Sequence, residues 1–307
     1  MAPLALLLLF AATAYMLLWR TRPPPPEAPT LDSLPLRSLS EALGQAHGSE
    51  VDAAKLYAVV LVDAYPTLDL EAIVAKVRGK WGTHATPTAV ATEDPPLRRS
   101  VGVPSAQIAF ELITPIDQHP VLGEAAARPA GNAHAAAVLV TLEADKRAVL
   151  QAVALSQFVF ALLDTCPQAR AVLWAPSRTL WSATQAKRVL ATDYEQRFPV
   201  GLWVSARAST LDDGRVQGYT LGLTALGSTE FEALDAREGP QALADRLRSL
   251  AEYALLSCRT IFNGDTTGVD GCERIRLQKV PSQTVHRGWV FQLRYLKASP
   301  QQPWEND

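Results

Sequence analysis

An uncharged apolar run near the start of the sequence constrains this chain more than any other feature. Residues 3–19 (PLALLLLFAATAYMLLW) carry no charged side chain, and Arg20 and Arg22 follow directly. As an α-helix the run would be about 26 Å long at about 1.5 Å per residue, which is the short end of what crosses a bilayer. We therefore predict that residues 1–22 form a single transmembrane anchor.

The charges beside this run predict its orientation. No Lys or Arg precedes it, whereas Arg20, Arg22 and Arg37 follow it. Positive flanks stay cytoplasmic, so we expect the N-terminus outside and residues 20–307 in the cytoplasm. The alternative is export with a cleaved signal, because residues 12–14 (ATA) offer a cleavage site. Against it, no basic segment precedes the run, and cleavage would leave the apolar residues 15–19 on the mature chain.

The composition of the remaining chain excludes some partners and suggests a source. The net charge is −2, and no basic block follows the juxtamembrane arginines, so we expect no nucleic-acid partner. The three cysteines form no C-x-x-C motif, which is typical of a reducing compartment. Arg outnumbers Lys and Ala is abundant, which is typical of GC-rich genomes. We therefore expect a bacterial protein of the inner (cytoplasmic) membrane.

Hydrophobic periodicity predicts an α+β fold with two β-α-β-β-type units, whose antiparallel or mixed sheets pack on helices. A Pro-rich linker at 23–54 leads to a first subdomain at 55–116. A Pro- and Gly-rich connection at 117–132 leads to a second subdomain at 133–297, and residues 298–307 form a tail. Strands are predicted at 55–63, 86–92, 107–114, 133–142, 170–174, 178–181, 200–210, 215–226, 230–234, 273–280 and 289–296. Helices are predicted at 68–81, 146–166, 183–194 and 240–258.

One loop, at 263–271 (NGDTTGVDG), is the best candidate for a functional site. Asn263, Asp265, Thr267 and Gly268 match positions 1, 3, 5 and 6 of an EF-hand loop, but position 12 is Arg274 instead of glutamate. The favoured interpretation is a turn-rich connection whose side chains cap backbone N–H groups. We expect no metal and no cofactor, since phosphate-loop and zinc-ligand spacings are also absent from the sequence.

Two further groups of residues are candidates for acid–base chemistry. Glu230 and Glu232 alternate with Phe231 on a predicted strand, so both carboxylates would share one face. Such a pair could act as general acid and base, but a solvated sheet face is the favoured interpretation. His134 begins an apolar strand and is expected to be a structural histidine rather than a catalytic one.

Short motifs follow one another in a characteristic order in the second half of the chain. They are Ala133-His134, Leu202-Trp203-Val204, Thr220-Leu221-Gly222-Leu223, Leu226-Gly227, Glu230-Phe231-Glu232 and Gly264-Asp265-Thr266 with Gly268. Together they resemble a bacterial domain-of-unknown-function family (DUF family 4261). The similarity is expected to cover about residues 130–296, and the family implies an α+β domain with no assigned activity and no catalytic residues to transfer.

Two functional hypotheses follow. The first is a single-pass, membrane-anchored protein whose cytoplasmic domain binds another protein, as an accessory, adaptor or immunity-type factor. The second is an enzyme with an unrecognised site near Asp265, Glu230 and His134, with Thr266 and Gly268 in the candidate loop. The second hypothesis requires these side chains to meet in one place.

Overall fold

The computed structural model describes residues 56–64, 66–88, 98–104, 106–113, 134–144, 148–191, 198–257, 260–268 and 275–296. All of these residues belong to one compact unit, Leu36–Asp307. The predicted anchor at 1–22, the linker at 23–54, the connection at 117–132 and the tail at 298–307 lie outside them. Within the described ranges, no helix combines the length and the hydropathy needed to cross a membrane.

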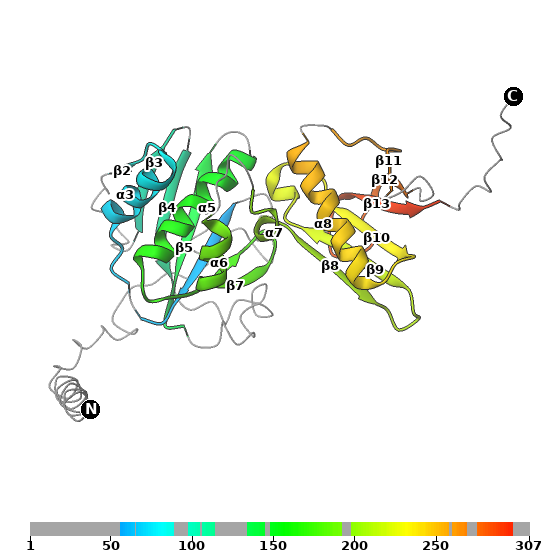
Figure 1. Cartoon of the computed structure of the whole chain (residues 1–307), viewed down its shortest axis with the longest axis horizontal. Helices are drawn as coiled ribbons and strands as arrows, with labels where there is room; N and C mark the ends of the chain where they lie inside the picture. Colours follow the sequence, from blue (N-terminus) through cyan, green and yellow to red (C-terminus); the bar gives the residue numbers. More distant parts are fainter. Residues whose placement is uncertain are drawn as a thin grey trace, which may run out of the picture. The chain divides into compact units, whose positions relative to one another are not determined.

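The first half of this unit is a seven-stranded sheet in the order β2-β3-β4-β5-β1-β6-β7, with every neighbouring pair antiparallel (Figure 1). Its strands are β1 Tyr57–Val62, β2 Thr86–Thr88, β3 Arg98–Val103, β4 Ala106–Ile113, β5 Ala136–Ala144, β6 Ala169–Trp174 and β7 Thr179–Ser182. Strand β3 was not predicted. The division between the two sheets falls after β7, so this sheet takes strands from both sides of the predicted connection at 117–132.

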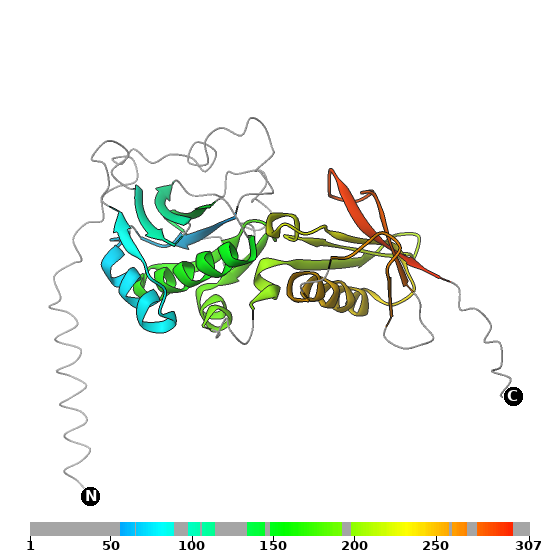
Figure 2. The ribbon, with the colours of Figure 1, turned by 90° about the horizontal axis from the view of Figure 1, so that it is seen from above.

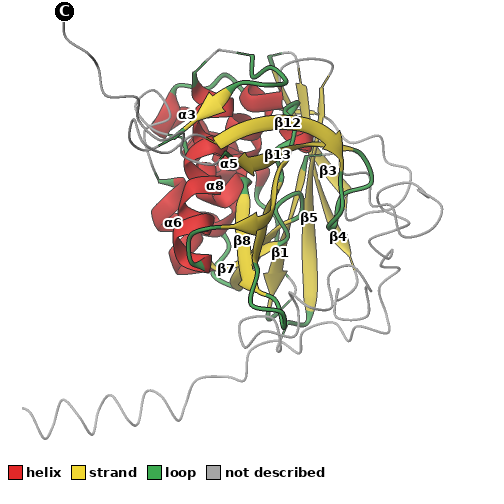
Figure 3. Cartoon of the chain, turned by 90° about the vertical axis from the view of Figure 1, so that its right-hand side faces the viewer, coloured by secondary structure: helices red, strands yellow, loops and turns green. Residues whose placement is uncertain are grey.

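Three helices, α3 Leu70–Trp81, α5 Ala148–Thr165 and α6 Ala183–Leu190, lie on one face of this sheet (Figure 3). Strand β1 shows how the sequence builds both faces. Its even-numbered residues, among them Val60, join the core beneath the helices, and its odd-numbered residues, among them Val59, join a second apolar cluster on the other face. Because both faces are buried, β1 is apolar throughout instead of alternating.

The second half is a six-stranded sheet in the order β11-β12-β13-β10-β9-β8. Its strands are β8 Ser205–Thr210, β9 Val216–Leu221, β10 Phe231–Ala236, β11 Thr266–Thr267, β12 Ile275–Pro281 and β13 Trp289–Tyr295. Only β10 and β13 pair in parallel, so this sheet is mixed. The predicted α+β class with antiparallel and mixed sheets is confirmed.

Helix α8 (Pro240–Leu256) covers one face of the six-stranded sheet. A Cβ atom at Gly218 would lie 2.8 Å from Leu243 and 3.0 Å from Leu247, so this position on β9 faces the helix at close range. Since side chains alternate along a strand, Tyr219 points to the opposite face. Glu232 lies directly across from Tyr219, and Gln292 directly across from Glu232. These three side chains therefore belong to the face without α8.

The prediction of an uninterrupted strand at 200–210 was wrong at its start. Residues Val200–Trp203 form a short helix, α7, and β8 begins at Ser205. The cause is tertiary. The Trp203 indole is fully buried and donates a hydrogen bond of 2.8 Å to the buried Ser156 hydroxyl of α5. Packing against α5 therefore determines the conformation of this segment and outweighs its strand-like sequence pattern.

A second set of contacts joins the β6–β7 turn to the same segment. The buried Ser177 hydroxyl donates to the Leu202 carbonyl oxygen at 2.9 Å, and the Ser205 hydroxyl donates to the Ser177 carbonyl oxygen at 2.8 Å. Gly222, at the end of β9, lies against the Trp203 carbonyl with φ at +117°. These contacts hold the start of β8 beside the β6–β7 turn.

Candidate functional site

The two carboxylates at the start of β10 are buried. Glu230 is 4% exposed and Glu232 is 0% exposed. The predicted solvated sheet face was therefore wrong for both residues. A buried carboxylate needs hydrogen-bond donors to offset its lost hydration, and each of the two has its own set.

Glu230 binds the end of β9 and the turn that follows it. Its Oε2 accepts from the Thr220 hydroxyl at 2.7 Å, and its Oε1 accepts from the backbone N–H groups of Gly222 at 2.9 Å and Thr224 at 3.0 Å. The Thr220 hydroxyl oxygen in turn accepts from the Phe231 N–H at 2.8 Å. One carboxylate thus fixes the turn between β9 and β10.

Glu232 binds the loop between β12 and β13. Its Oε2 accepts from the hydroxyls of Ser282 at 2.7 Å and Thr284 at 2.9 Å, and the Gln283 N–H lies 3.2 Å from Oε1. The Gln292 side-chain amide approaches Oε1 at 3.4 Å. Residues 282–289, which we name the hairpin tip, are therefore tethered to the centre of the sheet, on the face opposite α8 (Figure 2).

His286 of the hairpin tip completes the cluster. Its ring meets the Tyr219 ring edge to face, with centroids 6.1 Å apart. Burial lowers the pKa of His286 below its ordinary value, and the nearby carboxylates of Glu230 and Glu232 oppose this shift. Its Nε2 atom is buried and makes no hydrogen bond. Gln292 Oε1 is likewise buried without a partner.

This geometry suits tethering better than acid–base catalysis. A hydroxyl nucleophile is activated by a base, such as a histidine or a carboxylate, that a third group orients. Here each carboxylate accepts at least three hydrogen bonds at once, from hydroxyls and backbone N–H groups, and His286 Nε2 receives no hydroxyl. The cluster therefore holds the β9–β10 turn and the β12–β13 loop against the sheet.

The structure separates the site residues predicted from sequence. Glu230 precedes β10, Asp265 precedes β11 at the edge of the same sheet, and His134 precedes β5 in the other sheet. The convergence that the enzyme hypothesis requires is not seen among these three residues. Glu230 instead shares a cluster with His286, which the sequence analysis missed. More than fifty residues separate the two, and no sequence spacing marks such a pair.

The loop at 263–268 follows the capping interpretation. Asp265 Oδ2 accepts from the Phe262 N–H, and Asn263 Oδ1 accepts from the Lys279 N–H of β12, both at 2.8 Å. Thr266 and Gly268 are exposed. Over the described ranges, no three His, Cys, Asp or Glu residues are placed to hold a metal ion.

Exposed apolar side chains concentrate in this half of the chain. The described residues include six large ones: Leu150, Tyr253, Leu256, Phe262, Val285 and Trp289. All except Leu150 lie between residues 253 and 289. Two of them, Val285 at 46% exposure and Trp289 at 62%, lie on the hairpin tip. Trp289, the first residue of β13, is thus an aromatic side chain that the fold leaves largely in solvent.

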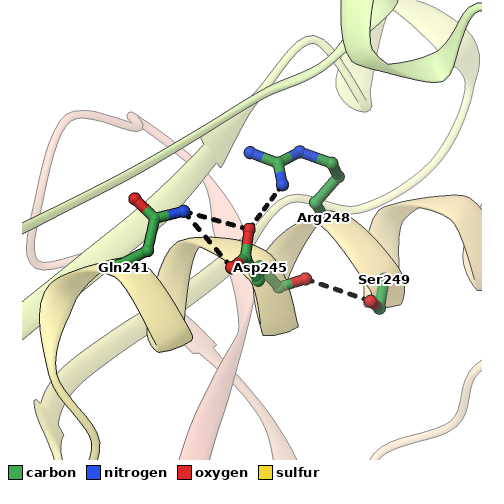
Figure 4. A network of polar contacts seen from close by, with 4 residues as sticks. All are labelled: Gln241, Asp245, Arg248 and Ser249. Atoms are coloured by element: carbon green, nitrogen blue, oxygen red, sulfur yellow. Dashed lines mark hydrogen bonds and ion pairs between the residues drawn. The ribbon is translucent and has the colours of Figure 1, made fainter.

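By contrast, the outer surface of α8 carries an ordinary polar network (Figure 4). The Asp245 carboxylate accepts from the Gln241 amide at 3.2 Å and from Arg248 Nη1 at 2.6 Å. These hydrogen bonds lower the pKa of Asp245. The network is exposed and lies within one helix, so it provides a control for the buried carboxylates rather than a second site.

Comparison with known proteins supports only a coarse assignment. Residues 219–293 match the model of a family described as Domain of unknown function (DUF4261). The similarity predicted from the motifs is confirmed for this part of the range 130–296, which holds Glu230, Glu232 and the hairpin tip. No curated protein and no solved structure matches the chain.

Proposed function

We propose that this chain is a single-pass, membrane-anchored protein whose α+β domain binds another protein through the hairpin tip. In this proposal residues 1–22 are the anchor, and the domain lies in the cytoplasm as an accessory, adaptor or immunity-type factor. The observation that carries the proposal is the exposed pair Val285 and Trp289 on a loop that Glu232 holds in place.

The energetics of protein interfaces favour this assignment. Tryptophan and arginine dominate the residues that contribute most to binding, and the hairpin tip contains Trp289 and Arg287. A loop that is already ordered loses less conformational entropy when it binds. Three side chains and one backbone N–H around Glu232 supply that order, and the Ser282 N–H also donates to the Gly288 carbonyl oxygen at 2.9 Å.

Site-specific photocrosslinking tests the proposal. A photoreactive phenylalanine analogue replaces Trp289 in the full chain in its native membranes, and a second chain carries the analogue at Leu150. Leu150 is the matched control because it is also exposed, at 56%, but lies on α5 in the other half of the unit. We expect one discrete protein adduct from position 289 and none from position 150. The absence of any adduct from position 289 would overturn the proposal.

A further inference from the structure

Two arginines lie beside the hairpin tip. Arg178 ends the β6–β7 turn in the left-handed region, with φ at 51°, and its side chain is exposed. Arg207 lies on β8 and donates from Nη2 to the Arg178 carbonyl oxygen at 3.0 Å. A left-handed backbone is uncommon for a residue other than Gly, Asn or Asp. The turn therefore holds this arginine in a backbone conformation of higher free energy.

The neighbouring strands and rings connect these arginines to the tip. Arg207 lies directly across from Tyr219 in the β8–β9 pair, so both side chains are on the face without α8. The Tyr219 ring contacts the His286 ring of the tip. The charge of Arg178 also acts on His286, helping to lower its pKa. Arg178, Arg207 and the tip thus belong to one surface.

Throughout the described ranges, Arg178 and Arg207 are two cations of this surface whose charge is not neutralised by an ion pair. Glu230 and Glu232 lie nearby, but both are buried and each already accepts at least three hydrogen bonds. Arg178 is exposed, Arg207 is half-buried, and a further arginine, Arg287, is exposed within the tip itself. A ligand would therefore meet guanidinium groups beside Trp289 and Val285.

We propose that the hairpin tip, together with Arg178 and Arg207, binds an acidic segment of a protein partner in which an apolar side chain adjoins the carboxylates. This inference rests on the proposed function and specifies the chemistry of its partner. Guanidinium groups bind carboxylates in a bidentate geometry, and the exposed Trp289 of the tip offers an apolar contact. An anionic membrane surface fits less well, because such sites gather four to eight Lys or Arg residues, and this surface has three.

A peptide-display selection tests this chemistry. A random linear peptide library is selected on the full chain in phosphatidylcholine nanodiscs, so that no anionic lipid competes. We expect enrichment of peptides rich in Asp and Glu next to Trp, Phe, Leu or Ile. Binding of the enriched peptides should weaken at least about tenfold in Arg178→Asn, which suits the left-handed turn, and in Arg207→Gln. Arg248→Gln on the outer surface of α8 is the control and should bind as the parent chain does.

Three results would overturn the inference. The first is enrichment of no acidic peptide, and the second is equal binding of acidic peptides by Arg178→Asn. The third is Arg178-dependent binding of phosphatidylglycerol vesicles without binding of acidic peptides, which would assign the surface to lipid. Crosslinking from position 289 separates these failures from failure of the proposed function. A protein adduct whose yield does not change in Arg178→Asn leaves the function intact and removes only the acidic partner.

Discussion

Gly222 occupies a position that no larger residue can take without moving the backbone. Its φ of +117° lies in the region that favours glycine, and an added Cβ would lie 2.2 Å from the Trp203 carbonyl oxygen. Gly222 also donates its N–H to Glu230. Gly222 therefore connects the end of β9 to the α7 segment and to the buried Glu230 carboxylate.

We predict that Gly222→Ala lowers the free energy of unfolding by more than about 2 kcal/mol, through backbone strain and a backbone clash. The matched control is Gly201→Ala in α7, where an added Cβ meets nothing within 4 Å. That variant should be neutral or gain up to about 1 kcal/mol. Urea-dependent pulse proteolysis of the chain measures both. Equal stability of the two variants would contradict this account of Gly222.

His286 predicts a defined pH dependence. Burial lowers its pKa in the folded state, so the unfolded chain binds the proton more tightly. Stability from this group is complete above the unfolded pKa of about 6.5 and is lost as pH falls through the lower folded value. We expect His286→Gln to flatten the fall in stability below pH of about 6.5. An unchanged pH profile of the urea midpoint in His286→Gln would contradict the prediction.

At the scale of elements, one carboxylate tethers the tip of the β12–β13 hairpin to β10. Glu232 accepts hydrogen bonds from Ser282, Gln283, Thr284 and Gln292. The hairpin tip that these bonds hold ends with the exposed residues Arg287 and Trp289. Removing the negative charge weakens every one of these bonds. The loop should then open more often while the core of the sheet stays folded.

We predict that Glu232→Gln raises the rate of trypsin cleavage after Arg287 by about tenfold or more, because each hydrogen bond to a charged group contributes about 1.5–3 kcal/mol. Asp245→Asn is the control. That carboxylate also accepts bonds from an amide and a guanidinium, but it is exposed and holds no loop. Mass spectrometry of timed digests identifies the site. Equal cleavage rates in the two variants would show that Glu232 does not hold the tip.

The elements themselves were largely predictable, for physical reasons. Helix α3 has an apolar face that contains the buried Ile73, Val74 and Val77, and its N-cap, Asp69, accepts from Ala72 N at 3.0 Å. The Asp212-Asp213-Gly214 turn between β8 and β9 has the residue types that favour a tight hairpin turn. Strand β3 was missed because its sequence, RRSVGV, carries few apolar residues and pairs through its backbone.

The candidate site was less predictable than the fold. Sequence periodicity places Glu230 and Glu232 on a strand, but it does not show the contacts that bury them. Glu230 is held by the turn after β9, and Glu232 by a loop fifty residues further along the chain. The exposure of Trp289 was equally unpredictable, because it depends on where the loop between β12 and β13 ends. Local patterns encode the elements, whereas the site depends on contacts between distant segments.

At the scale of the whole molecule, the predicted anchor has a direct test. We expect the full chain to remain in the membrane pellet after extraction at alkaline pH, because residues 3–19 provide an uncharged apolar span. A chain lacking residues 1–22 should move to the supernatant and keep its fold. Release of the full chain by alkaline extraction would exclude a transmembrane anchor.

The central claim is that an anchored chain presents the hairpin tip to a protein partner. Quantitative co-purification from native membranes in mild detergent tests it most directly, with the full chain beside Trp289→Ser and the control Leu150→Ser. We predict one near-stoichiometric partner that is retained by Leu150→Ser and falls at least about tenfold in Trp289→Ser. A partner held equally by all three chains, or no partner with any of them, would contradict the claim.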